Sequence, residues 1–367
     1  MPNYPFQRAK PLGWSLFEVL TSAQMNQVDG NAAQAADGLV WTDVAAFRNM
    51  TSPVTVAQAG MTVAYVPVND TWWVSAVSAG TMVTSRMYGG GGAFVGGLSS
   101  PTAGILNIEP RAVAFDPVNN YLVYGCTPTA SSNVKYRRSL QTGINAFTAH
   151  NSTQTNTSGP RCLGWAGGTI NLLISGHFST GVVETSADGG ATWINRTVPN
   201  ADGRLSIAFG GVASSSVVIS SDSAQSRVIQ SSDGITWSQR TLPASKIWSV
   251  VWVPLLGKFL AIADDMSAIA SSTDGITWAS IGAFSLPTAI GTLLSSFDSK
   301  FIAVGRTVFG VVLSSTTFLV YSQDGGLTWK VACSPVGPGS IGMLGSSGRQ
   351  LLYSIGTNVQ WSVAGGF

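Results

Sequence analysis

The chain has 367 residues and a formal net charge of +2, and only 10% of its residues are Asp, Glu, Lys or Arg. Typical soluble proteins carry roughly 25% charged residues, and no basic cluster here exceeds Arg137-Arg138 with Lys135 nearby, so composition argues against a nucleic-acid partner. The most apolar region, residues 247–263, is interrupted by Ser, Pro, Gly and Lys; it predicts two strands joined by a turn rather than membrane insertion.

The N-terminus and the cysteines indicate a protein made in the cytoplasm. The first residues, MPNYPFQRAKPLGW, lack the unbroken apolar core of a signal peptide. The cysteines Cys126, Cys162 and Cys333 include no CxxC pair, which favours buried thiols over disulfides or a zinc site. We therefore expect no metal and no cofactor.

Residues 1–14 are expected to form an N-terminal arm. Their prolines exclude a helix and predict extended backbone. The aromatic side chains between the prolines have no obvious core of this chain to enter, so we expect them to contact another protein. They are Tyr4, Phe6 and Trp14.

A short helix is predicted after the arm. Ser15-Leu16-Phe17-Glu18 is a capping-box pattern, and Thr21 to Gln24 gives a second start signal. Apolar residues at steps of three and four continue to about Ala36, although Gly30 weakens the pattern. The sequence thus divides into residues 1–36, an arm and helix, and residues 37–367.

The segment GWSLFEVLTSAQMNQVDGNAAQAADGLVWTDVAAF resembles the leading segment of tailed-bacteriophage virion proteins, in which a short arm and helix precede a variable domain. The resemblance implies that residues 1–36 attach the chain to other virion proteins. It also implies a homo-oligomer or multiple copies in a particle.

From residue 38 onward the sequence reads as strands, and one short motif recurs. The Asp of the motif can accept hydrogen bonds from backbone N–H groups and close a turn, and its Gly supplies positive φ. Its Trp can insert a flat ring between sheets. The second and third copies are one residue shorter from Asp to Trp and should differ in turn detail. The copies are Ser186 to Trp193 (SADGGATW), Ser231 to Trp237 (SSDGITW), Ser272 to Trp278 (STDGITW) and Ser322 to Trp329 (SQDGGLTW).

These copies resemble the Asp-box, the repeat of bacterial neuraminidases and related propellers, whose pattern is Ser-x-Asp-x-Gly-x-Thr-Trp. In families that carry it, the box lies on the outer rim of a β-propeller, away from the substrate. The resemblance therefore implies a fold and not sialidase chemistry. The structural residues that it implies are Asp188, Thr192, Trp193, Asp233, Thr236, Trp237, Asp274, Thr277, Trp278, Asp324, Thr328 and Trp329.

Spacing predicts the number of blades. The four motif tryptophans recur at intervals of roughly 40 to 50 residues, which is the length of one propeller blade. Residues 85–94 and 136–147 look like decayed copies of the motif and add two blades. The last repeat has predicted strands at 341–344, 350–355 and 358–362 but no fourth strand.

We expect the N-terminal part of the chain to supply the missing strand. Residues 37–44, DGLVWTDV, resemble the second half of a box followed by its strand, and an unfilled blade would expose unpaired backbone groups. Residues 39–47, with Leu39, Trp41 and Val44, are therefore predicted to close the ring. The expected fold is an all-β, seven-bladed β-propeller.

Sialidase-like catalysis is the sharpest alternative. Members of that family bind the substrate carboxylate with three arginines and use a tyrosine nucleophile paired with a glutamate, plus an aspartate acid/base. The glutamates of this chain are Glu18, Glu109 and Glu184, and no paired carboxylates or convergent arginines can be assigned. We therefore expect no catalytic residues and no enzyme.

Ligand binding is expected on the face opposite the boxes. Loops assigned to that face are rich in Ser, Thr, Asn and Asp, which can hydrogen-bond sugar hydroxyls or a protein surface, although ordinary solvated loops look the same. Both histidines are assigned to these loops, with solvated side chains as the simpler interpretation. The candidate residues are His150, Asn151, His177, Asp222, Asp264 and Arg306.

The sequence therefore predicts a non-enzymatic virion structural protein of the tail fibre or receptor-binding type. It would attach through residues 1–36 and present a propeller to a host-surface glycan or protein. Two alternatives stay open: a capsid decoration or head-fibre protein without a receptor, and a sialidase-like glycan hydrolase.

Overall fold

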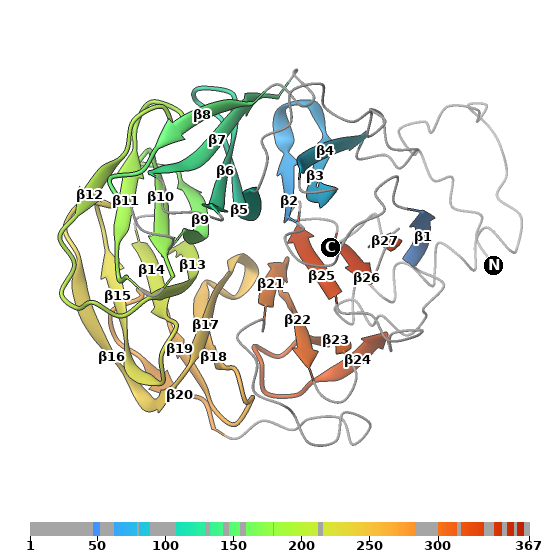
Figure 1. The fold of residues 1–367 in the computed structure, drawn as a ribbon. Helices are drawn as coiled ribbons and strands as arrows, with labels where there is room; N and C mark the ends of the chain where they lie inside the picture. Colours follow the sequence, from blue (N-terminus) through green and yellow to red (C-terminus); the bar gives the residue numbers. More distant parts are fainter. Residues whose placement is uncertain are drawn as a thin grey trace, which may run out of the picture.

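Antiparallel sheets arranged around a common axis make up the described part of the chain (Figure 1). The computed structural model describes residues 47–51, 62–78, 81–88, 108–128, 133–141, 147–154, 159–178, 180–211, 216–282, 300–313, 317–333, 341–346, 351–355 and 358–362. Within these residues the strands form seven sheets, numbered below in chain order. Two short 3-10 helices, Pro67–Asn69 and Pro254–Leu256, are the helical elements of the described ranges.

Six sheets have four described strands, and sheet 1 has three. Sheet 7 takes its outer strand, β1, from the N-terminal side of the chain. The strands are β2 (Thr62–Val66), β3 (Thr71–Ser78) and β4 (Thr81–Tyr88) in sheet 1; β5 (Ile108–Asp116), β6 (Tyr121–Pro128), β7 (Val134–Leu140) and β8 (Thr148–Asn151) in sheet 2; β9 (Pro160–Ala166), β10 (Leu172–His177), β11 (Val183–Ser186) and β12 (Ile194–Arg196) in sheet 3; β13 (Arg204–Gly210), β14 (Ser216–Ser221), β15 (Gln225–Ser231) and β16 (Ser238–Lys246) in sheet 4; β17 (Trp248–Val253), β18 (Lys258–Ala263), β19 (Ile269–Ser272) and β20 (Ala279–Ser280) in sheet 5; β21 (Lys300–Val304), β22 (Thr307–Leu313), β23 (Thr317–Ser322) and β24 (Lys330–Cys333) in sheet 6; and β25 (Ile341–Ser346), β26 (Leu351–Ile355), β27 (Asn358–Ser362) and β1 (Phe47–Thr51) in sheet 7.

The first strands of the sheets surround the axis (Figure 1). In the series β2, β5, β9, β13, β17, β21 and β25, each strand contacts the next, and β25 contacts β2. The contacts therefore run round a closed circle. The later strands of each sheet lie further from the axis, because each pairs with the strand before it.

Strand direction gives the ring two distinct faces. Because neighbouring strands are antiparallel, the turns after the first and third strands of every sheet lie at the same end. We call this end the turn face. The turns after the second strands and the links between successive sheets lie at the other end, which we call the connection face.

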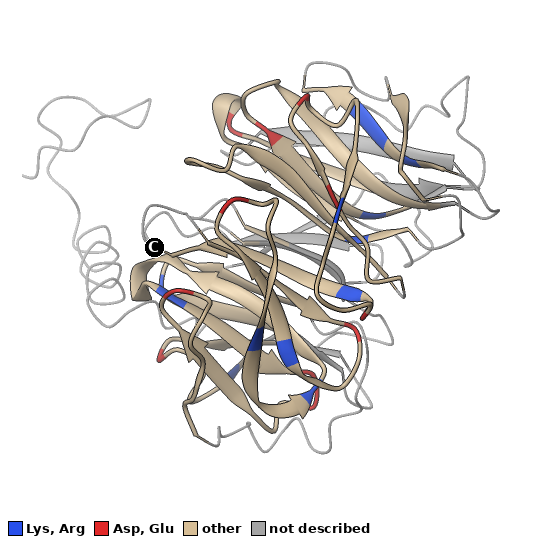
Figure 2. Cartoon of the chain, turned by 90° about the vertical axis from the view of Figure 1, so that its left-hand side faces the viewer, with Lys and Arg blue, Asp and Glu red and all other residues tan. Residues whose placement is uncertain are grey.

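Charged residues are scattered over the ring rather than gathered in one region (Figure 2). The core instead lies between neighbouring sheets. All six residues of β10 and all six of β14 are buried, since both faces of each strand are covered by other sheets.

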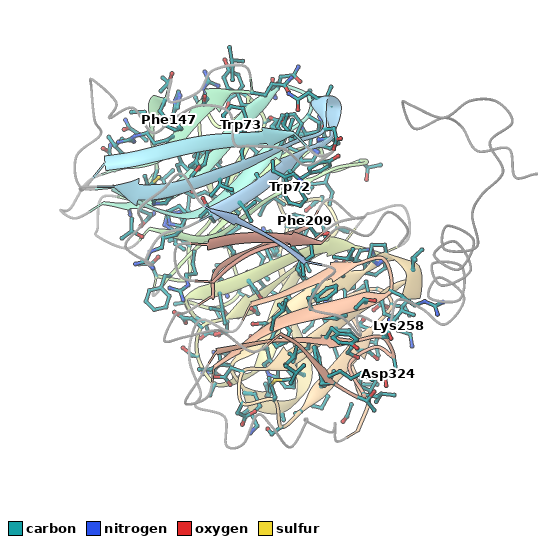
Figure 3. All side chains as sticks on the ribbon, turned by 90° about the vertical axis from the view of Figure 1, so that its right-hand side faces the viewer. Trp72, Trp73, Phe147, Phe209, Lys258 and Asp324 are labelled. Carbon is teal, nitrogen blue, oxygen red and sulfur yellow. The ribbon has the colours of Figure 1, made fainter. Side chains whose placement is uncertain are left out.

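Aromatic side chains join sheets 1 and 2. Trp73 packs with Leu122, Tyr124 and Phe147, and the rings of Tyr124 and Phe147 meet edge to face with centroids 5.5 Å apart. Trp72 and Trp73 of β3 are both almost fully buried. Figure 3 labels them and Phe147 in the upper half of the view, where the light-blue strands of sheet 1 lie.

Two glycines on the first strands allow close approach of the following sheet. A Cβ atom on Gly164 would lie 2.1 Å from the ring of Phe209, and one on Gly210 would lie 2.1 Å from the ring of Trp252. Any larger residue would displace the aromatic ring. These glycines are therefore required by contact between sheets.

Several predicted strands are confirmed. The two strands predicted within residues 247–263 are β17 and β18, the strand predicted at 358–362 is β27, and the all-β class is confirmed for the described ranges. The predicted arm with Tyr4, Phe6 and Trp14, and the predicted helix to about Ala36, lie outside the described residues.

The outer strand of sheet 7 differs in position from its prediction. β1 pairs with β27, with Phe47 opposite Ser362 and Thr51 opposite Asn358, whereas the sequence places this strand at residues 39–47. Leu39, Trp41 and Val44 lie outside the described residues. An outer strand is held by backbone N–H and C=O groups that every non-proline residue carries, so it needs no side-chain pattern that a sequence motif could reveal.

Candidate functional site

The two longer motif copies close their turns through an Asp carboxylate. Asp188 Oδ1 accepts hydrogen bonds from Ser186 Oγ at 2.8 Å, Ala191 N at 3.0 Å and Thr192 N at 2.9 Å. Asp188 Oδ2 accepts one from Thr192 Oγ1 at 2.6 Å. The Asp324 carboxylate likewise accepts from Ser322, and from the N–H and hydroxyl of Thr328.

The two shorter copies use the same acceptor with a different donor spacing. Asp233 Oδ1 accepts from Ile235 N and Thr236 N, both at 2.7 Å, which lie two and three residues along. Asp274 Oδ1 accepts from Ile276 N at 2.8 Å and Thr277 N at 3.0 Å. The predicted difference in turn detail is confirmed.

These hydrogen bonds also set the protonation of the turn carboxylates. Partial burial on its own would raise the pKa of Asp188, but bonds from Thr192, Ser186 and Ala191 lower it below its ordinary value. Hydrogen bonds from their own turns likewise lower the pKa values of Asp233, Asp274 and Asp324. The carboxylates are therefore charged acceptors for their own turns, and within the described residues no three His, Cys, Asp or Glu side chains gather as metal ligands.

Replacing Asp188 with Ala should lower the free energy of unfolding by about 1–3 kcal/mol, because the N–H groups of residues 191 and 192 lose their acceptor. Urea unfolding followed by circular dichroism measures the change. Asn195→Ala, at an exposed position on β12, is the control and should change stability by less than about 0.5 kcal/mol. Equal effects of the two substitutions would contradict a turn-closing role.

The motif tryptophans make the predicted contact between sheets. The Trp193 ring stacks on the Tyr136 ring of sheet 2, with centroids 3.7 Å apart and planes at 11°. Its Nε1 donates to Gly190 O at 3.1 Å. Trp278 and Trp329 donate in the same way, to Gly275 O at 3.1 Å and Gly326 O at 2.8 Å.

A buried polar cluster lies between sheets 2 and 3, centred on Glu184 of β11. Its carboxylate accepts hydrogen bonds from Tyr136 Oη at 2.8 Å, Ser152 Oγ at 2.9 Å and Thr153 N at 2.6 Å. His177 Nε2 lies 2.8 Å from Glu184 Oε2. Tyr136, His177 and Glu184 are each 0% exposed, so the cluster links the two sheets without reaching solvent.

Hydrogen-bond donors stabilise the negative charge of the Glu184 carboxylate. Burial on its own would raise the pKa of Glu184, but hydrogen bonds from His177 and Thr153, with attraction to the His177 ring, lower it to about 2. Burial and the neighbouring carboxylate raise the pKa of Tyr136 well above its ordinary value. At neutral pH the pair is therefore a carboxylate held by a protonated phenol, which is a structural contact and not an activated nucleophile.

Sequence reasoning missed this cluster. It gives Glu184 no role and assigns His177 to a solvated loop, whereas His177 ends β10 and is fully buried. One signal was present: Glu184 directly follows Val182-Val183 in a predicted strand, and a carboxylate in a buried strand must find donors.

The remaining candidate ligand residues do not converge. His150 lies on β8 rather than in a loop, with Nδ1 3.0 Å from Ala191 O, and Asn151 is the exposed last residue of that strand. Asp222 and Asp264 follow β14 and β18 on the connection face, as expected, but each is only 9% exposed. Arg306 lies in the turn between β21 and β22, on the turn face, so its predicted face is wrong.

Two cysteines confirm the expectation of buried thiols. Cys126 and Cys162 are free and buried, and burial raises the pKa of each thiol to about 12. Both are therefore protonated and unreactive at neutral pH.

An apolar cavity of about 360 Å³ lies near the axis. Its lining comes from the first strands of sheets 1, 2, 3, 6 and 7 and from two prolines in turns of the turn face, so it is nearest that face. None of the described residues that line it is charged. The residues are Val63, Ala64, Tyr65, Pro67, Val113, Ala114, Phe115, Pro117, Gly164, Trp165, Ile302, Gly345 and Ser346.

Side-chain size differs between the first strands of the seven sheets. The second-to-last residue of the first strand is aromatic in five successive sheets: Tyr65, Phe115, Trp165, Phe209 and Trp252. In sheets 6 and 7 the same position holds Ala303 and Gly345. A Cβ atom on Gly345 would lie 2.4 Å from Val63, so Val63 of sheet 1 fills the place of a larger side chain there. Three of the five rings, those of Tyr65, Phe115 and Trp165, line the cavity. Such a site suits an uncharged apolar or aromatic group.

We expect indole, an uncharged aromatic probe, to bind this cavity and Ile302→Trp to weaken binding at least fivefold by filling it. Saturation-transfer NMR on the full chain measures the affinity. Leu255→Ala, at an exposed position outside the cavity lining, is the control and should bind indole like the parent chain. Unchanged binding by the Ile302→Trp variant would show that indole binds elsewhere.

Helices that could cross a membrane are absent from the described ranges. No protein-family model matches the sequence, and no curated protein is significantly similar to it.

Solved structures resemble the chain over most of its length. A structure described as YCF48 bound to D1 peptide is 17% identical with a TM-score of 0.58, and the match covers 87% of this chain and 95% of that one. An inactive virginiamycin B lyase from Staphylococcus aureus with quinupristin is 9% identical with a TM-score of 0.64, covering 86% and 98%. The β-propeller domain of Cps50 (Swd1) from Myceliophteria thermophila is 11% identical with a TM-score of 0.60, covering 87% and 100%.

At these identities the similarity concerns the fold and carries no activity or ligand with it. Each match covers nearly the whole length of the solved structure, and the sheets of this chain also form a circle. The chain therefore has a β-propeller fold.

Proposed function

We propose that the chain is a non-enzymatic structural protein of a tailed-bacteriophage virion, of the tail fibre or receptor-binding type. The N-terminal segment GWSLFEVLTSAQMNQVDG supports the virion part of this proposal through its resemblance to leading segments of such proteins. Residues 1–36 would join the chain to other virion proteins, and the propeller would face a host-surface glycan or protein.

The finer architecture belongs to the same proposal: a seven-bladed propeller with Asp-box hairpins, closed by an N-terminal strand. Seven described sheets support the blade count. The hydrogen bonds of Asp188 and Asp233 within their turns support the Asp-box assignment. The pairing of β1 with β27 supports closure by a strand from before the ring.

The burial of Tyr136, His177 and Glu184 is the observation that carries the non-enzymatic assignment. A sialidase-like glycosidase needs a tyrosine–glutamate pair at its substrate, and the pair in this chain is 0% exposed and stacked under Trp193. A sugar could reach it only if sheets 2 and 3 separated.

Binding of another macromolecule fits the molecule better than catalysis. One similar propeller is described as bound to a peptide, and this chain offers an uncharged apolar cavity at its axis. Shape and apolar lining support recognition, since such pockets hold ligands without needing reactive groups.

Two measurements test the proposal. Mass spectrometry of purified particles should find the chain among the virion proteins, and labelled chain should remain on host cells or immobilised surface glycans without releasing product. Release of sugar would favour the hydrolase, and presence in particles without retention would favour the decoration protein. Absence from particles would overturn the virion assignment.

A further inference from the structure

All the large hydrophobic side chains recorded as exposed within the described residues lie at the same end of the ring. They occupy turns after first strands, turns after third strands, or the strand residue next to such a turn. They are Val68, Val118, Leu140, Ile194, Ile235, Leu255, Ile276 and Leu327. Single exposed hydrophobics are ordinary, but eight of them at one end of the ring offer apolar area that a partner could cover.

The motif turns account for part of this arrangement. The residue before the motif Thr is Ile235, Ile276 or Leu327 in three copies, and each is between 41% and 49% exposed. The hydrogen bonds of the shorter turns use the backbone N–H of this residue and not its side chain, yet the side chain is apolar. Val68, Val118 and Leu255 are still more exposed, at 59% or above.

The axial cavity adds a recess to the same face. Pro67 and Pro117, which line it, belong to turns of the turn face next to Val68 and Val118. Apolar residues therefore continue from the turns toward the axis. We call the eight exposed hydrophobic residues of the turn face the apolar rim; the cavity lies at its centre.

Charges on this face largely offset one another. Exposed Asp233, Asp274 and Asp324 belong to turns of sheets 4 to 6, where Lys258 and Arg306 are also exposed. Figure 3 shows Lys258 and Asp324 at the same end of neighbouring sheets. Attraction to this face would thus depend on apolar burial and change little with salt, unlike binding to nucleic acid or an anionic surface.

The strand register shows at which face β1 begins. Asn358 follows the turn between β26 and β27 on the connection face, so Ser362 and its partner Phe47 lie at the turn face. The 46 residues that precede β1 therefore join the ring at the turn face. They include the arm and helix assigned to virion attachment.

We propose that the turn face docks against the same virion protein that residues 1–36 engage, through an uncharged apolar surface on that protein. The inference rests on the proposed function and adds an orientation to it. The connection face, with Asp222 and Asp264, points away from the particle. The arm and the apolar rim act together, so that the tether raises the local concentration of the face at its partner.

Thiol labelling of particles tests the orientation. Leu255→Cys lies on the turn face at an original exposure of 64%, and Ala224→Cys lies in an exposed turn of the connection face. The native thiols Cys126 and Cys162 are buried, and the third cysteine, Cys333, is replaced by Ala in both variants so that only the introduced thiol is labelled. Each variant is labelled with a PEG-maleimide, as free chain and in purified particles that carry it in place of the parent chain.

Leu255→Cys should react at least tenfold more slowly in particles than as free chain, and Ala224→Cys at the same rate in both. Equal rates for Leu255→Cys, or protection of Ala224→Cys alone, would overturn the orientation while leaving the virion assignment standing. Absence of both variants and the parent chain from particles would instead be failure of the proposed function. Protection of Leu255→Cys in the free chain, with a doubled mass by light scattering, would assign the face to a second copy and overturn the proposal.

The number of copies of the chain incorporated per particle provides a second readout. The double variant Val118→Glu, Leu255→Glu should reduce the copies per particle at least tenfold at unchanged circular dichroism, and Ala224→Glu should not. Normal incorporation of the folded double variant would contradict docking through this face.

Discussion

Glu184→Ala should lower the free energy of unfolding by about 3–5 kcal/mol, as expected when one partner of a buried charged cluster is removed. The substitution leaves Tyr136 Oη, Ser152 Oγ and Thr153 N without their acceptor in a region closed to solvent. Because these donors come from sheet 2 and from the segment after β8, the loss weakens contact between sheets 2 and 3. Urea unfolding followed by tryptophan fluorescence measures it.

Two substitutions control for this result. Glu184→Gln keeps the shape and one carbonyl oxygen but removes the charge, so its effect should be intermediate. Asp265→Ala removes a partly exposed carboxylate 2.6 Å from Lys246 Nζ and should cost less than about 1 kcal/mol. A loss for Glu184→Ala no larger than that for Asp265→Ala would show that the cluster is not a source of stability.

The same carboxylate should make stability fall in acid. Its folded pKa is about 2 against an ordinary value of 4.5, so its contribution is fully present above pH 4.5 and is lost as the pH falls toward 2. At about 1.4 kcal/mol per pH unit, the difference in pKa corresponds to about 3 kcal/mol. The stability gap between the parent chain and Glu184→Ala should therefore narrow by about that amount between pH 5 and pH 2. A gap independent of pH would contradict an ionised Glu184.

Deleting residues 1–51 should lower the unfolding temperature by about 8 °C and promote aggregation, whereas deleting residues 1–46 should not. The first deletion removes β1 and leaves the N–H and C=O groups of β27 unpaired along an outer edge. Each lost backbone hydrogen bond costs about 0.5–1.5 kcal/mol, so losing the pairing of β1 should cost about 4 kcal/mol in total. At about 2 °C per kcal/mol, which is usual for large domains, the unfolding temperature falls by about 8 °C. Differential scanning calorimetry and light scattering give the two readouts.

The shorter deletion is the matched control, because it keeps every residue of β1. The shift in unfolding temperature between the two truncated chains then reports on the five residues Phe47–Thr51 alone. Identical unfolding temperatures would show that β1 contributes nothing to sheet 7, and that closure by an N-terminal strand is wrong.

The candidate residues illustrate what pattern reasoning can and cannot reach. Asp188 and Trp193 were readable from sequence because their contacts are largely local: the carboxylate closes its own turn, and the indole donates to Gly190 O. His177 and Glu184 meet Tyr136 across a gap of 41 and 48 residues. No spacing rule predicts that encounter, since it depends on the packing of two sheets.

The face of the ring on which a turn lies was also hard to predict from sequence. The sequence assigns Arg306 to the face opposite the boxes, yet it lies on the turn face because β21 and β22 are joined there. An error of one strand in the assignment reverses the end at which a turn lies. The exposed apolar rim was missed for a related reason: Val68, Leu255 and Ile276 are far apart in sequence, and only the alternation of strand direction brings their turns to one end.

By itself the sequence determined the all-β class, several strand bounds and the local structure of the motif turns, because these depend on residues within one hairpin. Only the tertiary structure decided that the outer strand of sheet 7 is Phe47–Thr51, that Glu184 is satisfied by sheet 2, and that the first strands of five sheets line one axial cavity. Each of these depends on contacts between segments distant in the chain, and such contacts are chosen by the packing of whole sheets rather than by any short run of residues.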